Sequence, residues 1–448
     1  METVAALATP PGRGAIAIVR TTGPAAAAVA ARVARTVRPL RPRVATRARI
    51  VAADGALLDD GLALFFPAPH SYTGEDVVEL HLHGSPAVAR EALLALLEAG
   101  ARPARPGEFT RRAFLAGKLD LSAAEAVADT IAAEHRGAVR AAAARLAGGL
   151  ATIVDRQAQA LVGMLEELSA ALDFPGEVAA PSTEALGAQL RAVDAQLAEL
   201  TNDWERGRLV REGIAIAIVG PPNAGKSSML NALLGVERAL VSEEAGTTRD
   251  TIEESVALGN GSVGRLVDTA GLRPAASGLE AFGIARSERA LADATLVLVV
   301  VDGSRRLDGD AAAVLVRTRG RERVVVFNKA DLGTAGYEAR ETSEREALSA
   351  TTRREEDVER VRAALLAATG AAPLDTARPT IGTLRQADAV YAARRAVADA
   401  RATLARRDPV DLIAGDLATA HAALASLTGR DASEAVLDGV FARFCIGK

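Results

Sequence analysis

The segment IAIAIVGPPNAGKS (residues 214–227) decides the fold of the central part of the chain. Its first six residues are all apolar, as in a strand that is covered on both faces of a parallel sheet. The next eight match the phosphate-loop pattern, in which glycines let backbone N–H groups surround phosphates at a helix N-terminus. The helical run 228–234 follows directly. The segment therefore predicts a strand, a phosphate-binding loop and a helix, with Lys226 reaching the β- and γ-phosphates and the Ser227 hydroxyl ligating Mg²⁺.

Four later loops occur in the order that a guanine-nucleotide site requires. GTTRD (246–250) offers a switch threonine for Mg²⁺, and DTAG (268–271) offers an aspartate that holds Mg²⁺ through water. In NKAD (328–331), Asp331 can accept hydrogen bonds from N1 and N2 of guanine, an edge that adenine lacks. LSA (348–350) can close over the base. The residues predicted to bind GTP are Asn223, Ala224, Gly225, Lys226, Ser227, Ser228, Thr247, Thr248, Asp268, Thr269, Ala270, Gly271, Asn328, Lys329, Asp331, Ser349 and Ala350.

One position departs from the pattern of many small GTPases. Leu272 stands where those proteins carry a glutamine that orients the attacking water. Because a leucine side chain cannot orient water, either hydrolysis is very slow or another polar group does this. The polar candidates near the switches are Glu280, Arg249 and Arg273, although each also fits a solvated loop charge.

The chain before the phosphate loop divides into two segments with different patterns of apolar residues. Residues 1–118 mix short strand-like runs with Pro/Gly turns and one helical stretch, which predicts a compact α+β domain. From Ser122, with Glu125 in the capping-box position, a helical pattern with apolar steps of three and four runs to a stop at 173–176. A second helix follows Ser182. These helices are expected to pack as a bundle.

Helices return after the α/β part, at 384–406 and 410–427, with a last one capped by Asp431 and Glu434 in the box position. The simplest interpretation is an α/β domain inserted between two parts of one helical bundle. We therefore predict an N-terminal α+β domain (1–118), a first helical part (119–212), an inserted phosphate-loop domain of the Ras-like α/β type (213–372) and a second helical part (373–448).

Composition narrows the class of protein. The single cysteine, Cys445, excludes an intrachain disulfide, and the start lacks the charged and apolar regions of a signal peptide. No uninterrupted apolar run reaches the length of about 18 residues that a membrane span needs, so a cytoplasmic protein is expected. The net charge of -4 means that any RNA contact must use a local patch. Seven arginines between Arg32 and Arg49, with no acidic residue among them, could meet phosphates, but the sequence alone favours a solvated face.

Several strings outside the nucleotide loops resemble one family across essentially the whole chain. They are ATPPGRG (8–14), YTGED (72–76), RPGEF (105–109), KLDL (118–121) and FCIGK (444–448). With the nucleotide loops, these strings closely resemble the tRNA modification GTPases of the MnmE (TrmE) family.

The resemblance implies a homodimeric, potassium-stimulated GTPase. Such a protein works with the flavin-containing partner MnmG (GidA), as a heterotetramer, to install an aminomethyl or carboxymethylaminomethyl group on C5 of the wobble uridine of certain tRNAs. FAD is expected on the partner only, because no dinucleotide fingerprint occurs in this chain. The protein is not expected to bind a membrane.

The resemblance also implies that the N-terminal domain has the folate-binding fold of one-carbon enzymes, mediates dimerisation and binds 5-formyltetrahydrofolate or a related formyl-folate. A carboxylate suits the amino-pyrimidine edge of a pterin, and cations suit its glutamate tail. Cys445 of the terminal motif is expected at the modification centre. The positions that match the folate site are Arg20, Glu79, Lys118 and Lys448.

Further roles follow from the same resemblance. The water-orienting glutamate of the family falls on Glu280, which makes Glu280, Lys226 and Cys445 the catalytic candidates. The expected Mg²⁺ ligands are Ser227, Thr248 and, through water, Asp268. The expected K⁺ ligands are Asn223, Ser242, Glu244 and Thr247.

Other functions remain as alternatives. A regulatory GTPase switch of ribosome assembly would share the central domain but would need neither folate nor the FCIGK tail. A folate-dependent one-carbon transferase with a purely structural GTPase domain is disfavoured by the intact Lys226, Ser227, Thr248 and Asp268. A plain interaction scaffold would leave all three sets of motifs unexplained.

Overall fold

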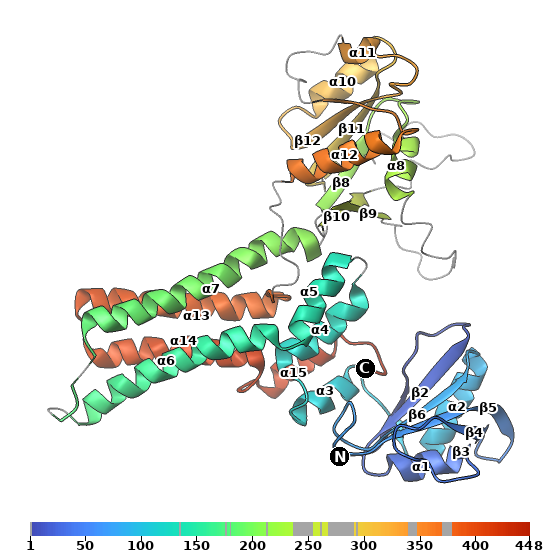
Figure 1. Cartoon of the computed structure of the whole chain (residues 1–448), viewed down its shortest axis with the longest axis vertical. Coiled ribbons are helices and arrows are strands. Elements are labelled where there is room, and N and C mark those ends of the chain that lie inside the picture. The colour runs from blue at the N-terminus through green and yellow to red at the C-terminus, as the bar shows by residue number, and fades with distance from the viewer. Residues whose placement is uncertain are drawn as a thin grey trace. The chain divides into compact units, whose positions relative to one another are not determined.

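The computed structural model describes residues 2–133, 136–174, 177–179, 181–211, 214–235, 254–259, 262–267, 291–292, 294–338, 347–369 and 379–448 (Figure 1). These residues form two compact units. The first comprises residues 1–132, 142–201 and 381–448, and the second comprises residues 133–141 and 202–380. The predicted domain borders after residues 118, 212 and 372 stay predictions.

A seven-stranded sheet with the order β3-β4-β5-β6-β2-β1-β7 forms the N-terminal part. All neighbouring strands are antiparallel except β1 and β7. Helices α1 and α2 pack against the sheet, and Val19, Ile50, Leu80 and Leu96 are fully buried in the shared core. The elements are β1 (Val4–Leu7), β2 (Ile16–Thr22), α1 (Ala26–Val33), β3 (Ala34–Arg35), β4 (Thr46–Val51), β5 (Leu57–Phe66), β6 (Val77–His83), α2 (Pro86–Glu98), β7 (Arg102–Pro103) and α3 (Glu108–Leu115).

The helical part contains long helices that lie side by side (Figure 1). Helix α14 packs against α13 and α6, and Asp194 of α7 pairs with Arg394 and Arg401 of α13 at 3.1 and 2.7 Å. The helices are α4 (Leu121–Ala132), α5 (Arg136–Leu146), α6 (Gly149–Asp173), α7 (Thr183–Arg211), α13 (Leu384–Arg406), α14 (Val410–Thr428) and α15 (Glu434–Phe441). By length and composition α14 could cross a bilayer, and so could α5 and α6 taken together as one bent span. In the structure α14 packs against α13 and α6.

The predicted long helix from Ser122 is wrong in two respects. The chain forms three helices there, and α6 begins after Gly148, which has a left-handed φ of 78°. The predicted capping box is absent, because Asp120 caps α4 by accepting a hydrogen bond from the Ala123 amide at 3.0 Å. Ser122 is buried in the first turn, and the Glu125 side chain is paired elsewhere.

The predicted cap of the last helix is also wrong. Helix α15 starts at Glu434, and the Ser433 hydroxyl accepts a hydrogen bond from the Val436 amide at 3.4 Å. Ser433 and Asp431 are both good capping residue types, so the sequence alone did not distinguish them. Glu434 instead pairs with Arg111 of α3.

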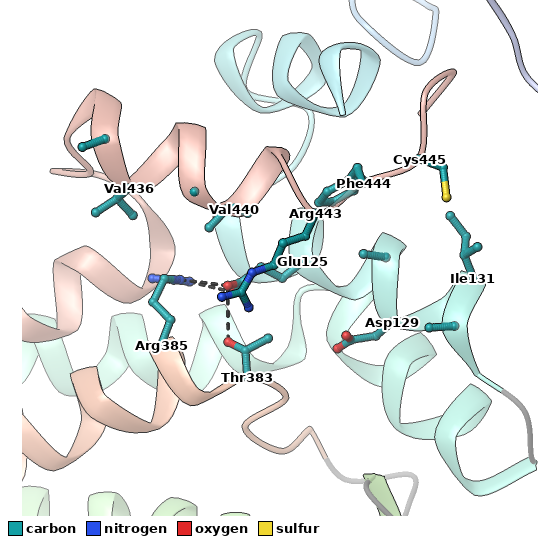
Figure 2. A pocket seen from close by; sticks show the side chains of 14 residues that line it. Glu125, Asp129, Ile131, Thr383, Arg385, Val436, Val440, Arg443, Phe444 and Cys445 are labelled. Carbon is teal, nitrogen blue, oxygen red and sulfur yellow. Dashed lines mark hydrogen bonds and ion pairs between the residues drawn. The ribbon is translucent and has the colours of Figure 1, made fainter. Parts of the chain in front are cut away.

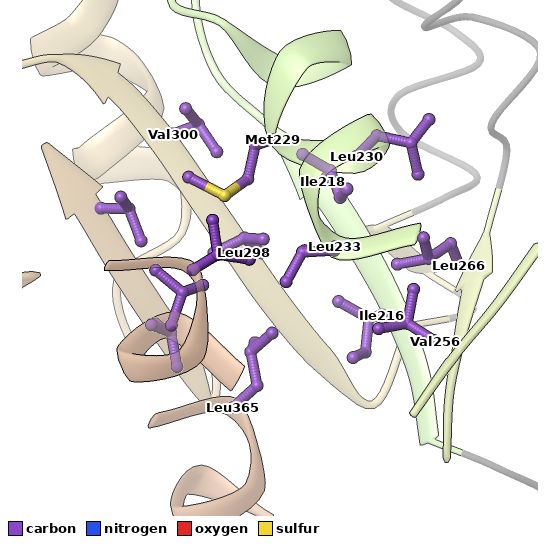
Figure 3. Close-up of a cluster of buried hydrophobic side chains, with 14 of the residues drawn as sticks. Ile216, Ile218, Met229, Leu230, Leu233, Val256, Leu266, Leu298, Val300 and Leu365 are labelled. Atoms are coloured by element: carbon purple, nitrogen blue, oxygen red, sulfur yellow. The ribbon is translucent and has the colours of Figure 1, made fainter. Parts of the chain in front are cut away.

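The nucleotide-binding part is a six-stranded sheet with the order β13-β12-β11-β8-β10-β9, parallel except for β9. Buried side chains fill both faces, and Figure 3 shows the face on which Met229 and Leu233 of α8 pack over Ile216 and Leu298. The predicted α/β domain inserted between helices is confirmed. Its elements are β8 (Ile214–Val219), α8 (Lys226–Leu234), β9 (Glu254–Gly259), β10 (Ser262–Val267), β11 (Leu296–Asp302), α10 (Gly309–Arg317), β12 (Arg323–Asn328), α11 (Ala335–Glu338), β13 (Leu348–Ser349) and α12 (Glu355–Ala368).

Candidate functional site

Two glycines of the loop between β8 and α8 cannot carry a side chain. A Cβ on Gly220 would lie 1.9 Å from the carbonyl oxygen of Val300, and a Cβ on Gly225 would lie 2.2 Å from Nδ2 of Asn328. Gly225 also has a φ of 95°, and Asn223 within the loop has a φ of 61°. The loop therefore curls tightly against the neighbouring strands, and its backbone N–H groups stand at the start of a helix, as an anion-binding loop requires.

The Lys226 side chain closes over this loop. Its Nζ donates hydrogen bonds to the carbonyl oxygens of Gly220 and Pro221 at 2.9 and 2.8 Å. Burial lowers the pKa of Lys226. A phosphate would offer this ammonium stronger, charged acceptors than two neutral carbonyls. Ser227 follows in the first turn of α8, half-buried, and Ser228 is exposed.

The loop predicted to read the base is tied to the phosphate loop. Nδ2 of the buried Asn328 donates to the carbonyl oxygen of Ala224 at 3.0 Å. Its Oδ1 is buried and has no hydrogen-bond partner among the described residues. Lys329 has a φ of 64° and donates from Nζ to Asp302 at 2.8 Å. Burial raises the pKa of Asp302, but the hydrogen bond from Lys329 contributes to a net lowering. The orphaned Asn328 oxygen is consistent with a donor that a bound ligand supplies.

Asp331 and the loop after β13 are the remaining described residues that are predicted to contact the base. The hydrogen bond from Thr351 lowers the pKa of Asp331, and Arg353 lies 3.2 Å from its carboxylate. Asp331 is therefore a carboxylate acceptor. Ala350 is buried, and its amide donates to the carbonyl of Phe327 at 3.0 Å. The carbonyl of Ser349 accepts from Arg360 at 2.9 Å, which holds this loop beside β12.

The predicted switch residues and most of the expected potassium ligands lie outside the residues that the structure describes. The predicted positions outside the described residues are Ser242, Glu244, Thr247, Thr248, Arg249, Asp268, Thr269, Ala270, Gly271, Leu272, Arg273 and Glu280.

In the N-terminal sheet, the structure pairs two of the four residues expected to bind folate. Arg20 and Glu79 lie opposite each other on β2 and β6, and Nη2 of Arg20 is 2.7 Å from Oε1 of Glu79. The other carboxylate oxygen faces Nε2 of His81 at 3.2 Å. The Arg20 guanidinium also lies over the rings of Tyr72 and Phe109, at 5.9 and 5.7 Å from their centres. This group combines a partly exposed carboxylate, a cation and aromatic surface, which suits a flat, polar heterocycle.

The C-terminal tail is held by backbone hydrogen bonds to the start of α3. A Cβ on Gly447, whose φ is 98°, would lie 2.2 Å from the carbonyl oxygen that ends β1. The carbonyl oxygen of Lys448 accepts from the Phe109 amide at 3.2 Å, and that of Cys445 accepts from Gly107 at 3.4 Å. The structure thus brings the FCIGK and RPGEF strings together. Lys118, the fourth expected residue, is exposed on the turn after α3.

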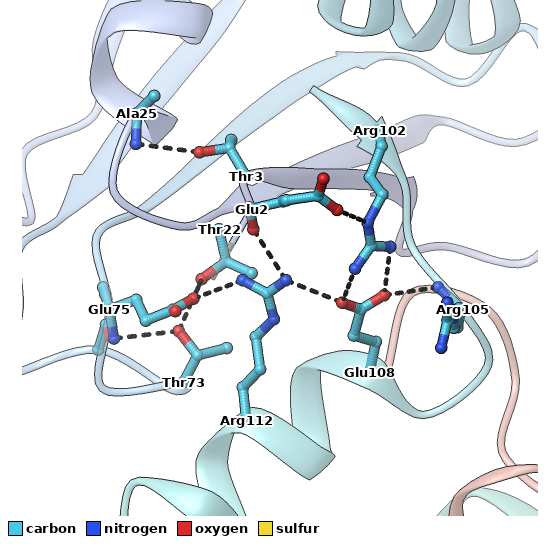
Figure 4. A network of polar contacts seen from close by, with 11 residues as sticks. Glu2, Thr3, Thr22, Ala25, Thr73, Glu75, Arg102, Arg105, Glu108 and Arg112 are labelled. Atoms are coloured by element: carbon cyan, nitrogen blue, oxygen red, sulfur yellow. Dashed lines mark hydrogen bonds and ion pairs between the residues drawn. The ribbon is translucent and has the colours of Figure 1, made fainter. Parts of the chain in front are cut away.

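A buried ionic network anchors this region (Figure 4), and the predicted site residues do not include it. Arg112 is 4% exposed and donates to Glu75, Glu108 and the backbone carbonyl of Glu2 at 2.8, 2.8 and 2.9 Å. Glu108 also accepts two hydrogen bonds from Arg102, at 2.6 and 2.9 Å. Glu75 and Glu108 belong to the YTGED and RPGEF strings. The sequence therefore contained a signal for both residues, although neither is among the predicted site residues.

This network predicts an acid-dependent stability. Burial raises the pKa of Glu108, but hydrogen bonds from Arg102 and Arg112 outweigh it and lower the value from 4.5 to about 2. A depressed carboxyl pKa contributes stability above pH 4.5 that is lost as the pH falls toward 2. Compared with Glu108→Gln, the wild-type chain should be more stable above pH 4.5, and this advantage should shrink steadily as the pH falls toward 2.

The measurement is the urea midpoint at a series of pH values, followed by hydrogen exchange of the peptide 108–115. Glu91→Gln is the control, because Glu91 is 43% exposed on α2 and, among the residues that the structure describes, pairs with the exposed Arg90. A difference between Glu108→Gln and wild type that does not change between pH 4.5 and 2 would contradict the pKa assignment.

A second feature absent from the predicted site is a cavity of about 620 Å³ beside α4 and α15 (Figure 2). The buried Glu125 carboxylate on its wall accepts from Nε and Nη2 of Arg385 at 2.8 and 2.7 Å and from Gln386 at 2.5 Å. Arg385 also donates to the carbonyl of Ser426 at 3.0 Å. Glu125 therefore fixes the first turn of α13 to α4. The exposed thiol of Cys445 opens onto the same cavity.

Comparisons with known proteins agree with this architecture. The family model described as "GTP-binding protein TrmE N-terminus" matches residues 3–118. The model described as "MnmE helical domain" matches residues 121–445. Among solved structures, the FeoB G-domain from Methanococcus jannaschii aligns with 35% of this chain and 98% of its own at 22% identity, with a TM-score of 0.24. That structural alignment adds nothing to the assignment.

Curated relatives match the chain from end to end. The tRNA modification GTPase MnmE of Moorella thermoacetica is 42% identical over 466 residues, which cover 100% of this chain and 99% of the relative. The proteins of the same name from Thiobacillus denitrificans and Symbiobacterium thermophilum are 41% and 43% identical, cover 98% and 99% of their own lengths and span 100% of this chain. Two family models and this full-length identity place the chain in the MnmE (TrmE) family of tRNA modification GTPases.

Proposed function

We propose that this chain is a potassium-stimulated GTPase that, with a flavin-containing partner, modifies C5 of the wobble uridine of certain tRNAs by using the one-carbon unit of a formyl-tetrahydrofolate. The observation that carries the GTPase part is the closed phosphate loop. Lys226 donates hydrogen bonds to two backbone carbonyls of this loop. Asn328 joins the base loop to the phosphate loop through its hydrogen bond to the Ala224 carbonyl. Membership of the family supports the tRNA part.

In the proposed GTP complex, each described residue has one task. The N–H groups of residues 224–228 surround the phosphates, and Lys226 exchanges its carbonyl acceptors for β- and γ-phosphate oxygens. Asp331 accepts from N1 and N2 of guanine, while Ser349 and Ala350 close over the base. The hydrogen bond from Asn328 to Ala224 holds the base loop and the phosphate loop together, so both would meet one nucleotide in a fixed arrangement.

Two cations are part of the proposal. Ser227, Thr248 and Asp268 would hold Mg²⁺, which supplies positive charge to the β- and γ-phosphates. Asn223, Ser242, Glu244 and Thr247 would hold K⁺ beside the phosphates. The left-handed Asn223 stands at the outer turn of the phosphate loop, which suits a ligand role. Glu280 would orient the attacking water in place of the glutamine that Leu272 replaces.

For the one-carbon step, we assign the folate to the group around Arg20 and Glu79. The carboxylate of Glu79 would accept from the amino-pyrimidine edge, and Lys118 and Lys448 would attract the glutamate tail. Cys445 is assigned to the modification centre, because its segment packs against Gly107 of the same region and its thiol is exposed.

The setting is also proposed. The chain would act in the cytoplasm as a homodimer, in a heterotetramer with MnmG (GidA), which carries FAD. The division into segments 1–118, 119–212, 213–372 and 373–448 belongs to the same proposal.

The test is GTP hydrolysis by the purified chain in potassium against sodium buffer, at matched ionic strength and several protein concentrations. We expect a rate that is clearly higher in potassium and that rises with concentration, because facing GTPase domains would create the potassium site. Glu280→Ala should abolish the potassium-stimulated rate and leave GTP binding intact. Equal, slow rates in both salts would favour the regulatory switch of ribosome assembly.

A further inference from the structure

The stretch between α1 and β4 presents a strongly basic surface. The arginine surface is defined here by its seven exposed members, and no acidic residue lies in the sequence between the first and the last of them. Because the chain as a whole has a net charge of -4, this surface is a local exception to its charge. Its members are Arg32, Arg35, Arg38, Arg41, Arg43, Arg47 and Arg49.

Strand register places two of these charges against each other. β3 is the edge strand of the sheet, and Arg35 on it lies directly opposite Arg49 on β4. Both side chains are exposed. Like charges directly opposite each other destabilise an antiparallel pair. Arg49 also lies opposite Asp60 of β5, whose carboxylate offsets part of this repulsion. A bound anion beside Arg35 would offset the rest.

Contacts within the chain engage only part of the arginine surface. Arg47 pairs with Asp60, and Arg43 donates to the carbonyl of His70 at 2.5 Å. Arg35, Arg38 and Arg41 have no side-chain partner within the described ranges of the chain. These three guanidiniums remain available for acceptors from outside the chain.

We propose that the arginine surface binds phosphate groups of an RNA backbone. The inference rests on the proposed function, in which the chain acts on tRNA, and it names the surface that holds the nucleic acid. A chain of negative net charge repels RNA at long range, so binding requires positive charge concentrated in one place. Arginine suits this role, because its planar guanidinium donates two parallel hydrogen bonds to one phosphate.

Arg38 and Arg41 allow the cleanest test. Both lie in the loop after β3, outside helices and strands, so Arg38→Gln with Arg41→Gln should leave the fold intact. The matched control is Arg156→Gln with Arg395→Gln, which removes the same charge from exposed positions on α6 and α13. All variants are made in the full chain.

The measurement is the affinity for an end-labelled, unmodified tRNA transcript by fluorescence anisotropy, between 50 and 200 mM KCl. We expect the Arg38/Arg41 variant to bind about 10-fold more weakly or worse at 100 mM salt. The slope of log affinity against log salt should fall by about 1.4–1.8, the loss of two phosphate contacts. The Arg156/Arg395 control should bind as the wild type does.

Equal tRNA affinity and equal salt slope in the Arg38/Arg41 variant and wild type would overturn the inference, and this result is also expected if the surface docks an acidic protein. A wild-type chain that does not bind the transcript would overturn it as well. The proposed function is judged separately by potassium-stimulated GTP hydrolysis, which neither pair of substitutions should change.

Discussion

Asp331→Asn should weaken GTP binding by about 100-fold or more and make xanthosine triphosphate the preferred nucleotide. The Asp331 carboxylate, kept ionised by Thr351 and Arg353, can accept two hydrogen bonds from the N–H groups of guanine. An asparagine amide presents one N–H₂ donor toward those donors, which leaves polar groups unpaired in the site. Xanthine carries a carbonyl in place of the guanine amino group, so the amide can donate to it.

The comparison uses equilibrium binding of both nucleotides and steady-state hydrolysis of each. Asp310→Asn is the matched control, because Asp310 is an exposed residue of α10 and its substitution makes the same chemical change away from the loop. Lys226→Ala should instead weaken both nucleotides alike, since it acts on phosphates. An Asp331→Asn variant that keeps its preference for GTP would show that Asp331 does not read the base.

Arg112→Met should destabilise the N-terminal domain by about 3–5 kcal/mol. The guanidinium is 4% exposed and lies between the carboxylates of Glu75 and Glu108, each 2.8 Å away. Methionine fills similar volume but removes one donor from Glu108. Within the described part of the chain, it leaves the Glu75 carboxylate with the Thr22 hydroxyl at 3.1 Å. Removing one partner from a buried ion pair is costly because the remaining charge stays buried.

The urea midpoint, read from hydrogen exchange of peptides in β1 and α3, measures this effect. Arg90→Met is the control, because Arg90 is 72% exposed and its pair with Glu91 spans 3.2 Å at the surface. Exposed pairs contribute about 0–1 kcal/mol. If Arg112→Met were no more destabilising than Arg90→Met, the network would have no structural role.

The sequence predicted the strand and the helix that flank the phosphate loop, because both are marked by signals over a few contiguous residues. The run 214–219 is buried on both faces of the sheet, as its uninterrupted apolar residues indicated. The helix 384–406 has the predicted bounds, since apolar periodicity and flanking breakers are local signals.

The predictions of the helix caps were wrong, because contacts with distant residues decide between neighbouring capping residues. Asp120 and Ser122 both suit an N-cap. In the structure Asp120 caps the helix, and the glutamate that a capping box at Ser122 would need is paired with Arg385. Arg385 comes from a helix 260 positions away in the chain. A pattern of neighbouring residues does not contain that information.

By itself, the sequence determined the α/β class of the central domain and its insertion between helices, because these depend on residue type over a few adjacent positions. Only the tertiary structure decided that Arg20 pairs with Glu79, 59 positions away, and that Asn328 joins Ala224, 104 positions away. It also placed Arg35 against Arg49 and buried Arg112 between two carboxylates. Strand register and chain packing set these contacts, and both arise only when distant segments fold together.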